Sequence, residues 1–364
     1  MKRQLYLEYL RAIATYAVIL WHCVTNVYDQ FGPLREWFPA SITVGLLVRW
    51  SVPVFFMISG ALLLNKDEDL AGFYKKRFAR ICIPLVVWVV LYGTVKLYHF
   101  MIYSPPRPSF FRYVIIDNFG LFLFNKLSYH FYFVSIILGL YLLSPFISKM
   151  VRSLTRRELE ILLLIGVGAY SIRTFYPNLF IVDNIQIGSH LVFFILGHYL
   201  YRYPPEKKVR RSMYITGLCS AILAAWLSYY KEYVDKGHQD TFYKTNSFFI
   251  FAISIAIFVF FQQNIQPAAD DKANSPIRKA ILFVSSNSYG FFLAHPLIIN
   301  ILLYSNFKFY TLTTSRLTLK LGGKEAGFEM NNTAGGYLLS LLVFIILLVV
   351  FYIIKRVRLT RYVT

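Results

Sequence analysis

Long apolar stretches separated by short polar and basic segments dominate the chain. A helix that crosses the hydrocarbon core of a bilayer needs about 20 mostly apolar residues, and on this criterion the sequence predicts ten spans. They cover about residues 5–27, 40–64, 81–102, 128–149, 159–176, 185–202, 212–230, 246–264, 281–305 and 335–354. The pattern therefore predicts an all-α, polytopic membrane protein whose two chain ends lie on the same side of the bilayer.

The segments between the predicted spans are too short to form a second domain. The longest polar stretches, Lys231–Lys244 and Asn306–Asn332, have the length of loops. Phe110–Lys126 is rich in aromatic residues but interrupted by polar ones, which favours an interfacial or re-entrant element. We therefore expect one integral-membrane domain over residues 1–364 and no separate soluble domain.

Basic residues predict the orientation of the spans. With the N-terminus inside, the cytoplasmic segments contain 23 of the 38 Lys and Arg residues, as the positive-inside rule requires. The sequence therefore predicts a multi-pass protein of the plasma membrane with both termini in the cytoplasm.

Composition and charge argue against a nucleic-acid-binding protein and against a disulfide or metal site. Hydrophobic residues make up 57% of the chain and charged residues 15%, below the roughly 25% of soluble domains. The net charge of +20 is distributed in clusters between apolar runs, which argues against a nucleic-acid partner. Cys23, Cys82 and Cys219 have neither paired nor metal-ligand spacing, so no disulfide framework or metal site is expected. The N-terminal run lacks a small-residue cleavage site and is expected to remain as the first helix.

The first span carries three ionisable residues that lipid does not favour: Glu8, Arg11 and His22. On a helix, Arg11 and His22 point within about 20° of each other but stand roughly 16 Å apart along the axis. Glu8 precedes Arg11 by three residues, so these two side chains can pair. One alternative is that Glu8 and Arg11 are interface residues and His22 a hydrogen-bonded structural histidine. Alignment of Arg11 and His22 on one face favours a cavity or pathway instead.

Five segments together resemble acyltransferase family 3, integral-membrane enzymes that acylate extracytoplasmic sugars. They are "RAIATYAVILWH" (Arg11–His22), "VPVFFMISGALLL" (Val52–Leu64), "FYKKRFARICIPL" (Phe73–Leu85), "YHFYFVSIILGLYLLSPFI" (Tyr129–Ile147) and "SYGFFLAHPLII" (Ser288–Ile299). The chain departs from many relatives in having Glu8 where an Asp is frequent and Tyr132 where a Trp is common, and in lacking an esterase-like domain.

The resemblance implies that an acyl group, typically acetyl, passes from acyl-CoA to a glycan hydroxyl. A histidine with an ordinary pKa of about 6.5 can take the proton of such a hydroxyl, so His22 is the candidate general base. A covalent acyl-histidine remains an alternative to direct transfer. Glu8, Arg11 and His130 complete the candidate catalytic set; for His130 the alternative is an amphipathic anchor at the interface.

Fixed arginines suit the phosphates of coenzyme A. Arg77 and Arg80, one turn apart at the cytoplasmic mouth of the third span, are therefore the candidate donor-binding residues, together with Arg11. Their alternative role is that of membrane anchors. Because His22 lies past the midplane, the thioester would travel up an internal channel while the nucleotide stays inside.

For other polar residues, a structural role competes with a role in substrate binding. His295, Tyr289 and Ser59 are candidate substrate-binding residues, although His295 could satisfy the helix interrupted by Pro296 and Ser59 could serve close packing beside Gly60. Further polar positions are expected to be structural (His190, His198) or to extend toward the outer surface (Arg49, Lys96).

Two other functions fit the same pattern: a transporter or flippase for a polysaccharide or lipid-linked sugar, and a non-catalytic membrane subunit of a glycan-synthesis complex. The absence of recognisable internal repeats argues against the transporter. The expected partners are a glycan acceptor, the lipid bilayer and other membrane proteins of glycan synthesis, and no metal cofactor is expected.

Overall fold

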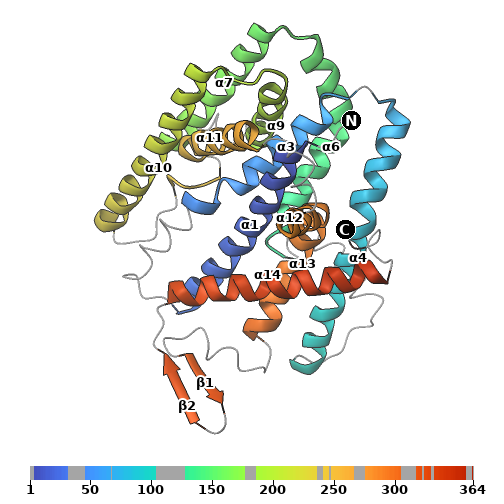
Figure 1. Cartoon of the computed structure of the whole chain (residues 1–364), viewed down its shortest axis with the longest axis vertical. Coiled ribbons are helices and arrows are strands. Elements are labelled where there is room, and N and C mark those ends of the chain that lie inside the picture. The colour runs from blue at the N-terminus through green and yellow to red at the C-terminus, as the bar shows by residue number, and fades with distance from the viewer. Residues whose placement is uncertain are drawn as a thin grey trace.

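The computed structural model shows a bundle of helices with a small hairpin (Figure 1). It describes residues 4–31, 46–66, 68–103, 128–176, 186–235, 241–245, 247–265, 275–304, 317–321, 324–328, 332–357 and 363. The helices are α1 (Leu5–Phe31), α3 (Ser51–Leu63), α4 (Leu70–Tyr103), α6 (Phe131–Ser153), α7 (Arg156–Phe175), α9 (Gln186–Arg202), α10 (Lys207–Asp235), α11 (Phe248–Asn264), α12 (Pro276–Ser286), α13 (Ser288–Tyr304) and α14 (Asn332–Arg356). Strands β1 (Leu317–Leu321) and β2 (Lys324–Phe328) pair in antiparallel register.

Every predicted span overlaps one of these helices, with one important refinement. The ninth span is broken into α12 and α13, which meet at an angle of 77°. The predicted loop after residue 231 begins later, because α10 continues to Asp235. The hairpin β1–β2 lies within the second polar stretch, whereas Phe110–Lys126 lies outside the described residues.

Several helices are long and apolar enough to cross a membrane. Among the described residues, five stretches meet this condition: Leu46–Leu63, Leu70–Val95, Phe131–Ser153, Lys207–Lys231 and Gly335–Arg356. The bent pair α12–α13 makes a sixth if it is counted as one span. These helices establish the character of a membrane protein, while the number of ten spans and their orientation stay predictions.

Helix α1 forms the centre of the packing, and α3 and α9 form the tightest pair beside it. Leu10, Ala14 and Cys23 of α1 are fully buried, and α1 contacts α3, α12, α13 and α14. Between α3 and α9 the backbones touch: a Cβ added to Gly60 would lie 1.7 Å from the carbonyl oxygen of Phe194. The expectation that Gly60 permits close helix packing is thus confirmed.

Helix α4 lies at one edge of the bundle, away from α7, α9, α10 and α11 (Figure 1). Its most extensive described contacts with other helices are those with α13 and α6. Tyr289 of α13 donates a hydrogen bond to the carbonyl oxygen of Ile81 (3.3 Å), and Tyr92 of α4 donates one to that of Leu293 (3.0 Å). These two bonds tie α4 to α13, while a space remains between α4 and helices α1 and α3.

Candidate active site

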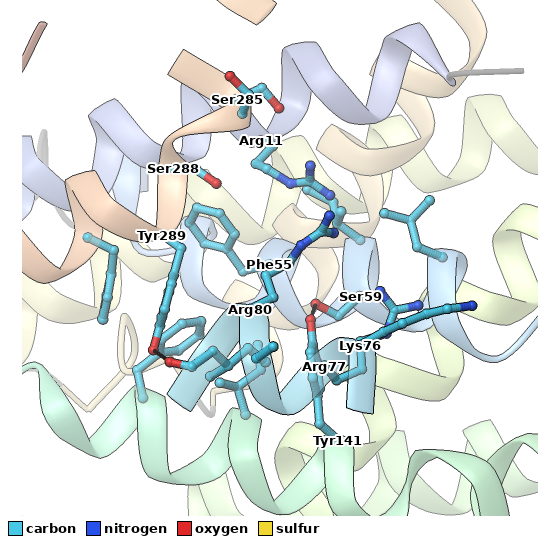
Figure 2. Close-up of a pocket in the computed structure, with 18 of the residues that line it drawn as sticks. Arg11, Phe55, Ser59, Lys76, Arg77, Arg80, Tyr141, Ser285, Ser288 and Tyr289 are labelled. Atoms are coloured by element: carbon cyan, nitrogen blue, oxygen red, sulfur yellow. Dashed lines mark hydrogen bonds between the residues drawn. The ribbon is translucent and has the colours of Figure 1, made fainter. Parts of the chain in front are cut away.

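A cavity of about 1020 Å³ occupies this space (Figure 2). Its wall comes from α1, α3, α4, α6 and the α12–α13 bend. One part of the wall has four cations, Arg11, Lys76, Arg77 and Arg80, and the whole space is therefore called here the basic cavity. The remainder is largely apolar, with side chains that include Phe55, Ile58, Leu62, Phe133, Ile137 and Phe292. Such a space suits a ligand with a charged end and a less polar arm.

Six of the candidate site residues line this one cavity, although they are distributed from residue 8 to residue 289. They are Glu8, Arg11, Ser59, Arg77, Arg80 and Tyr289. Figure 2 shows Arg11 and Arg80 pointing toward one another from α1 and α4. The arginines are therefore placed to hold a ligand between them, which a role as lipid anchors alone does not require.

Glu8 connects Arg11 to the α12–α13 bend. Its Oε2 lies 3.7 Å from Nη1 of Arg11, as the three-residue spacing predicts. The same oxygen accepts a hydrogen bond of 2.5 Å from the hydroxyl of Ser285, a residue that is almost fully buried. Because the hydrogen bond from Ser285 holds the Glu8 carboxylate in one rotamer, its negative charge lies beside the Arg11 guanidinium at the cavity wall.

Unlike its neighbour Gly60, Ser59 does not face α9. Its hydroxyl faces the cavity and lies 3.4 Å from the hydroxyl of Tyr141 on α6. Tyr289, whose ring also lines the cavity, is held by its hydrogen bond to Ile81. Both positions suit contacts with the arm of a bound ligand (Figure 2).

His22, His130 and His295 come together as a second group, called here the histidine cluster. The centroid of the His295 ring lies 5.2 Å from that of His22, in a stacked arrangement, and 5.7 Å from that of His130. Tyr129 lies 4.6 Å from His22. The cluster joins α1, the start of α6 and α13, so the ring of His22 faces the interior of the protein.

Buried nitrogens distinguish His130 and His295. The residues His130 and His295 are 1% and 0% exposed, so protein encloses the His130 side chain, which does not extend to the surface as an anchor would. Nδ1 of His295 lies 3.3 Å from the carbonyl oxygen of Phe291, and because that oxygen can only accept, Nδ1 carries the proton. Nε2 of each ring has no hydrogen-bond partner among the residues the structure describes, which leaves the Nε2 lone pair of His295 available as a proton acceptor.

Phe292 forms the boundary between the two groups. It lines the basic cavity, and its ring lies 5.5 Å from that of His130 and 5.7 Å from that of His295. Phe133 packs against it at 4.8 Å. His22 is not among the cavity-lining residues, so the cavity ends short of His22, and Phe292 contacts both the cavity and the cluster.

Arg49 differs from its expected outward orientation. Its guanidinium carbon lies 3.7 Å from the centroid of the Trp21 ring and 5.9 Å from that of Tyr243. A cation–π contact with a neighbouring helix holds it inside, beside His22. Neither Arg49 nor Tyr129 was assigned to the site from sequence, because their proximity to His22 arises from helix packing. The side chain of Lys96 lies outside the described residues.

Beyond the cluster, the structure describes the side chains of two further histidines, both on α9. His190 lies edge-on to Phe56 at 4.9 Å, and His198 is fully buried. Among the residues that the structure describes, no group of three His, Cys, Asp or Glu side chains could hold a metal ion.

The positive charge around Arg77 and Arg80 favours the binding of anions. Lys66, between α3 and α4, has a lowered pKa, chiefly because of burial and next because of the Arg77 guanidinium. Lys76 and Arg80 add positive charge to the same region. A bound polyanion would relieve this repulsion.

Comparison with known proteins identifies the family. Residues 4–356 match the family 3 model described as "Acyltransferase domain". Comparison with curated proteins found no match, and comparison with solved structures found none either.

Proposed function

Because the chain belongs to acyltransferase family 3, we propose that it transfers a small acyl group, most simply acetyl, from cytoplasmic acyl-CoA to a hydroxyl group of an extracytoplasmic or lipid-linked glycan. The observation that carries this proposal is the contact between the basic cavity and the histidine cluster through Phe292. One group suits a phosphorylated carrier, and the other suits proton transfer.

The basic cavity binds the donor in this proposal. Arg77 and Arg80 hold the phosphates, and Arg11, which pairs with Glu8, adds a third guanidinium. The arm of the coenzyme follows the apolar wall past Ser59 and Tyr289 toward Phe292. The thioester then reaches the histidine cluster while the charged end stays in the cavity.

The histidine cluster carries out the transfer. His22 takes the proton of the acceptor hydroxyl as its oxygen attacks the thioester carbonyl carbon; the carbon–sulfur bond then breaks. The proton passes to the departing thiolate, so the products are the acylated glycan and free coenzyme A. His130 and His295 border the reacting groups, where Nε2 of His295 can accept a hydrogen bond from the acceptor. An acyl-histidine intermediate remains the alternative route.

The proposal assumes the predicted topology, with ten spans in the plasma membrane and both termini in the cytoplasm. The donor then enters from the cytoplasmic side and the glycan from the outer side. Other membrane proteins of glycan synthesis would supply or receive the acceptor.

The test is mass analysis of the surface glycan from cells that carry the wild-type chain, no chain, or His22→Ala at equal membrane levels. We expect acyl groups on the glycan only with the wild-type chain, and export equal in all three. Loss of export with acylation intact would identify a transporter and overturn the proposal.

A further inference from the structure

Arg77 is neutralised by an acid that does not belong to the cavity wall. Glu68, in the connection between α3 and α4, places Oε2 at 3.7 Å from Nη2 of Arg77 and Oε1 at 3.9 Å from Nζ of Lys76. The side chains of Arg77 and Glu68 are 15% and 22% exposed, whereas that of Lys76 is 66% exposed. The shielded contact is therefore the one between Glu68 and Arg77.

This contact balances charge without good hydrogen bonds. A charge-assisted N–H···O bond measures about 2.7–2.9 Å, and the pair is separated by 3.7 Å. Nε of Arg77 and Oε2 of Glu68 are both shielded from solvent, and neither has a hydrogen-bond partner in the described part of the chain. An anion with several oxygens could therefore bind Arg77 better than Glu68 does.

The surroundings retain excess positive charge even with Glu68 in place. Arg80 has no carboxylate oxygen within 4 Å among the described residues, although it lines the same cavity. Burial and the Arg77 guanidinium also lower the pKa of Lys66. A polyanion that replaced Glu68 would contact Arg77 and Arg80 together, since they lie one turn apart on α4.

We infer that Glu68 is an internal counter-ion that holds Arg77 in the place of a donor phosphate and leaves it when the donor binds. The inference rests on the proposed function, because it takes the phosphorylated donor as the ligand of Arg77. Glu68 then weakens the binding of every anion by competition. A carrier with several phosphates overcomes this competition through its additional contacts, while a small monoanion does not.

The test measures coenzyme A binding to purified, full-length protein in detergent, without any acyl transfer. Glu68→Gln should tighten coenzyme A binding by about 3- to 10-fold. The matched control is Glu206→Gln, which removes the same charge from an exposed position at the start of α10, outside the cavity wall. The control should leave the dissociation constant within about twofold of wild type.

A double-mutant cycle identifies the partner of Glu68. In an Arg77→Gln background, coenzyme A binding should be weaker, and adding Glu68→Gln should then change it by less than about twofold. Thermal unfolding without ligand serves to establish that each variant is folded.

Three outcomes would overturn the inference. If Glu68→Gln binds coenzyme A no more tightly than Glu206→Gln, Glu68 does not compete with the donor, although the donor site stands. If tightening persists in the Arg77→Gln background, Glu68 acts through another cation. If the wild-type protein binds no coenzyme A, the proposed donor fails, and the inference fails with it.

Discussion

The basic cavity and the histidine cluster meet at Phe292 but differ in charge, access and composition. The cavity surrounds about 1020 Å³ with cations from α1 and α4. The cluster has imidazole and aromatic rings in contact, and His130 and His295 are almost fully buried. Recognition of phosphate tolerates water, whereas transfer of an acyl group gains from its exclusion, since water would hydrolyse the activated acyl group. In the proposed reaction, this separation gives donor binding and acyl transfer the different surroundings that they need.

The largest effect should come from His22→Ala. Loss of a general base lowers the rate of the chemical step by about 10²- to 10⁴-fold, while coenzyme A binding should stay within about twofold, since His22 does not line the cavity. Coenzyme A release from acetyl-CoA and equilibrium binding measure the two quantities. His190→Ala, which removes a histidine packed against Phe56, is the control. Equal loss of binding and turnover in His22→Ala would contradict the division.

The converse change is Arg77→Gln with Arg80→Gln. Each lost charge-assisted contact weakens binding substantially, so the donor KM should rise about 10- to 100-fold with little change in kcat. The remaining dependence of KM on ionic strength should also be smaller. Arg157→Gln, at an exposed position of α7, controls for a lost surface charge. A fall in kcat at unchanged KM would place these arginines in the transfer step instead.

Phe292 offers a way to sharpen the boundary between the regions. Phe292→Trp enlarges a side chain on the proposed path of the thioester arm, so kcat should fall about tenfold while coenzyme A binding changes little. Phe292→Leu keeps the site apolar with a smaller side chain and should retain most of the turnover. Acyl-transfer kinetics of both variants, at equal amounts of folded protein, make the comparison. Equal kcat values would show that the arm takes another path.

The smallest effect concerns Lys66 and alkaline pH. Its lowered pKa means that part of its charge is lost at a pH below that of an ordinary lysine. A bound anion favours the charged form, so binding takes up protons and weakens as pH rises through this pKa. Lys66→Gln should weaken coenzyme A binding by less than about threefold near neutral pH and reduce its alkaline decline. A steeper decline in the variant would contradict this assignment.

Much of the fold follows from apolar periodicity. Each predicted span overlaps a helix because a continuous apolar run specifies helix directly in a membrane. The break at Asn287 was not predicted, since the apolar character continues from α12 into α13 and only the serines around it interrupt the run. The hairpin β1–β2 was also not predicted, because its residues follow no strand pattern strong enough to separate them from a loop.

Contacts in the candidate site could be predicted from the sequence where both partners belong to one helix. They could not be predicted where the packing of separate helices brings the partners together. The spacing of Glu8 and Arg11 predicted their ion pair. By contrast, the contact of Glu8 with Ser285 joins residues far apart in sequence. The stacking of Arg49 on Trp21 and the approach of Glu68 to Arg77 likewise depend on how separate segments meet.

The bend between α12 and α13 connects the basic cavity to the histidine cluster. Ser285, before the break, holds Glu8, and His295, after it, stacks on His22. One alanine inserted after Asn287 would rotate all of α13 by about 100°. Tyr289 would turn from Ile81 and His295 from His22 in the same movement, so a lesion of one residue would disrupt the basic cavity and the histidine cluster together.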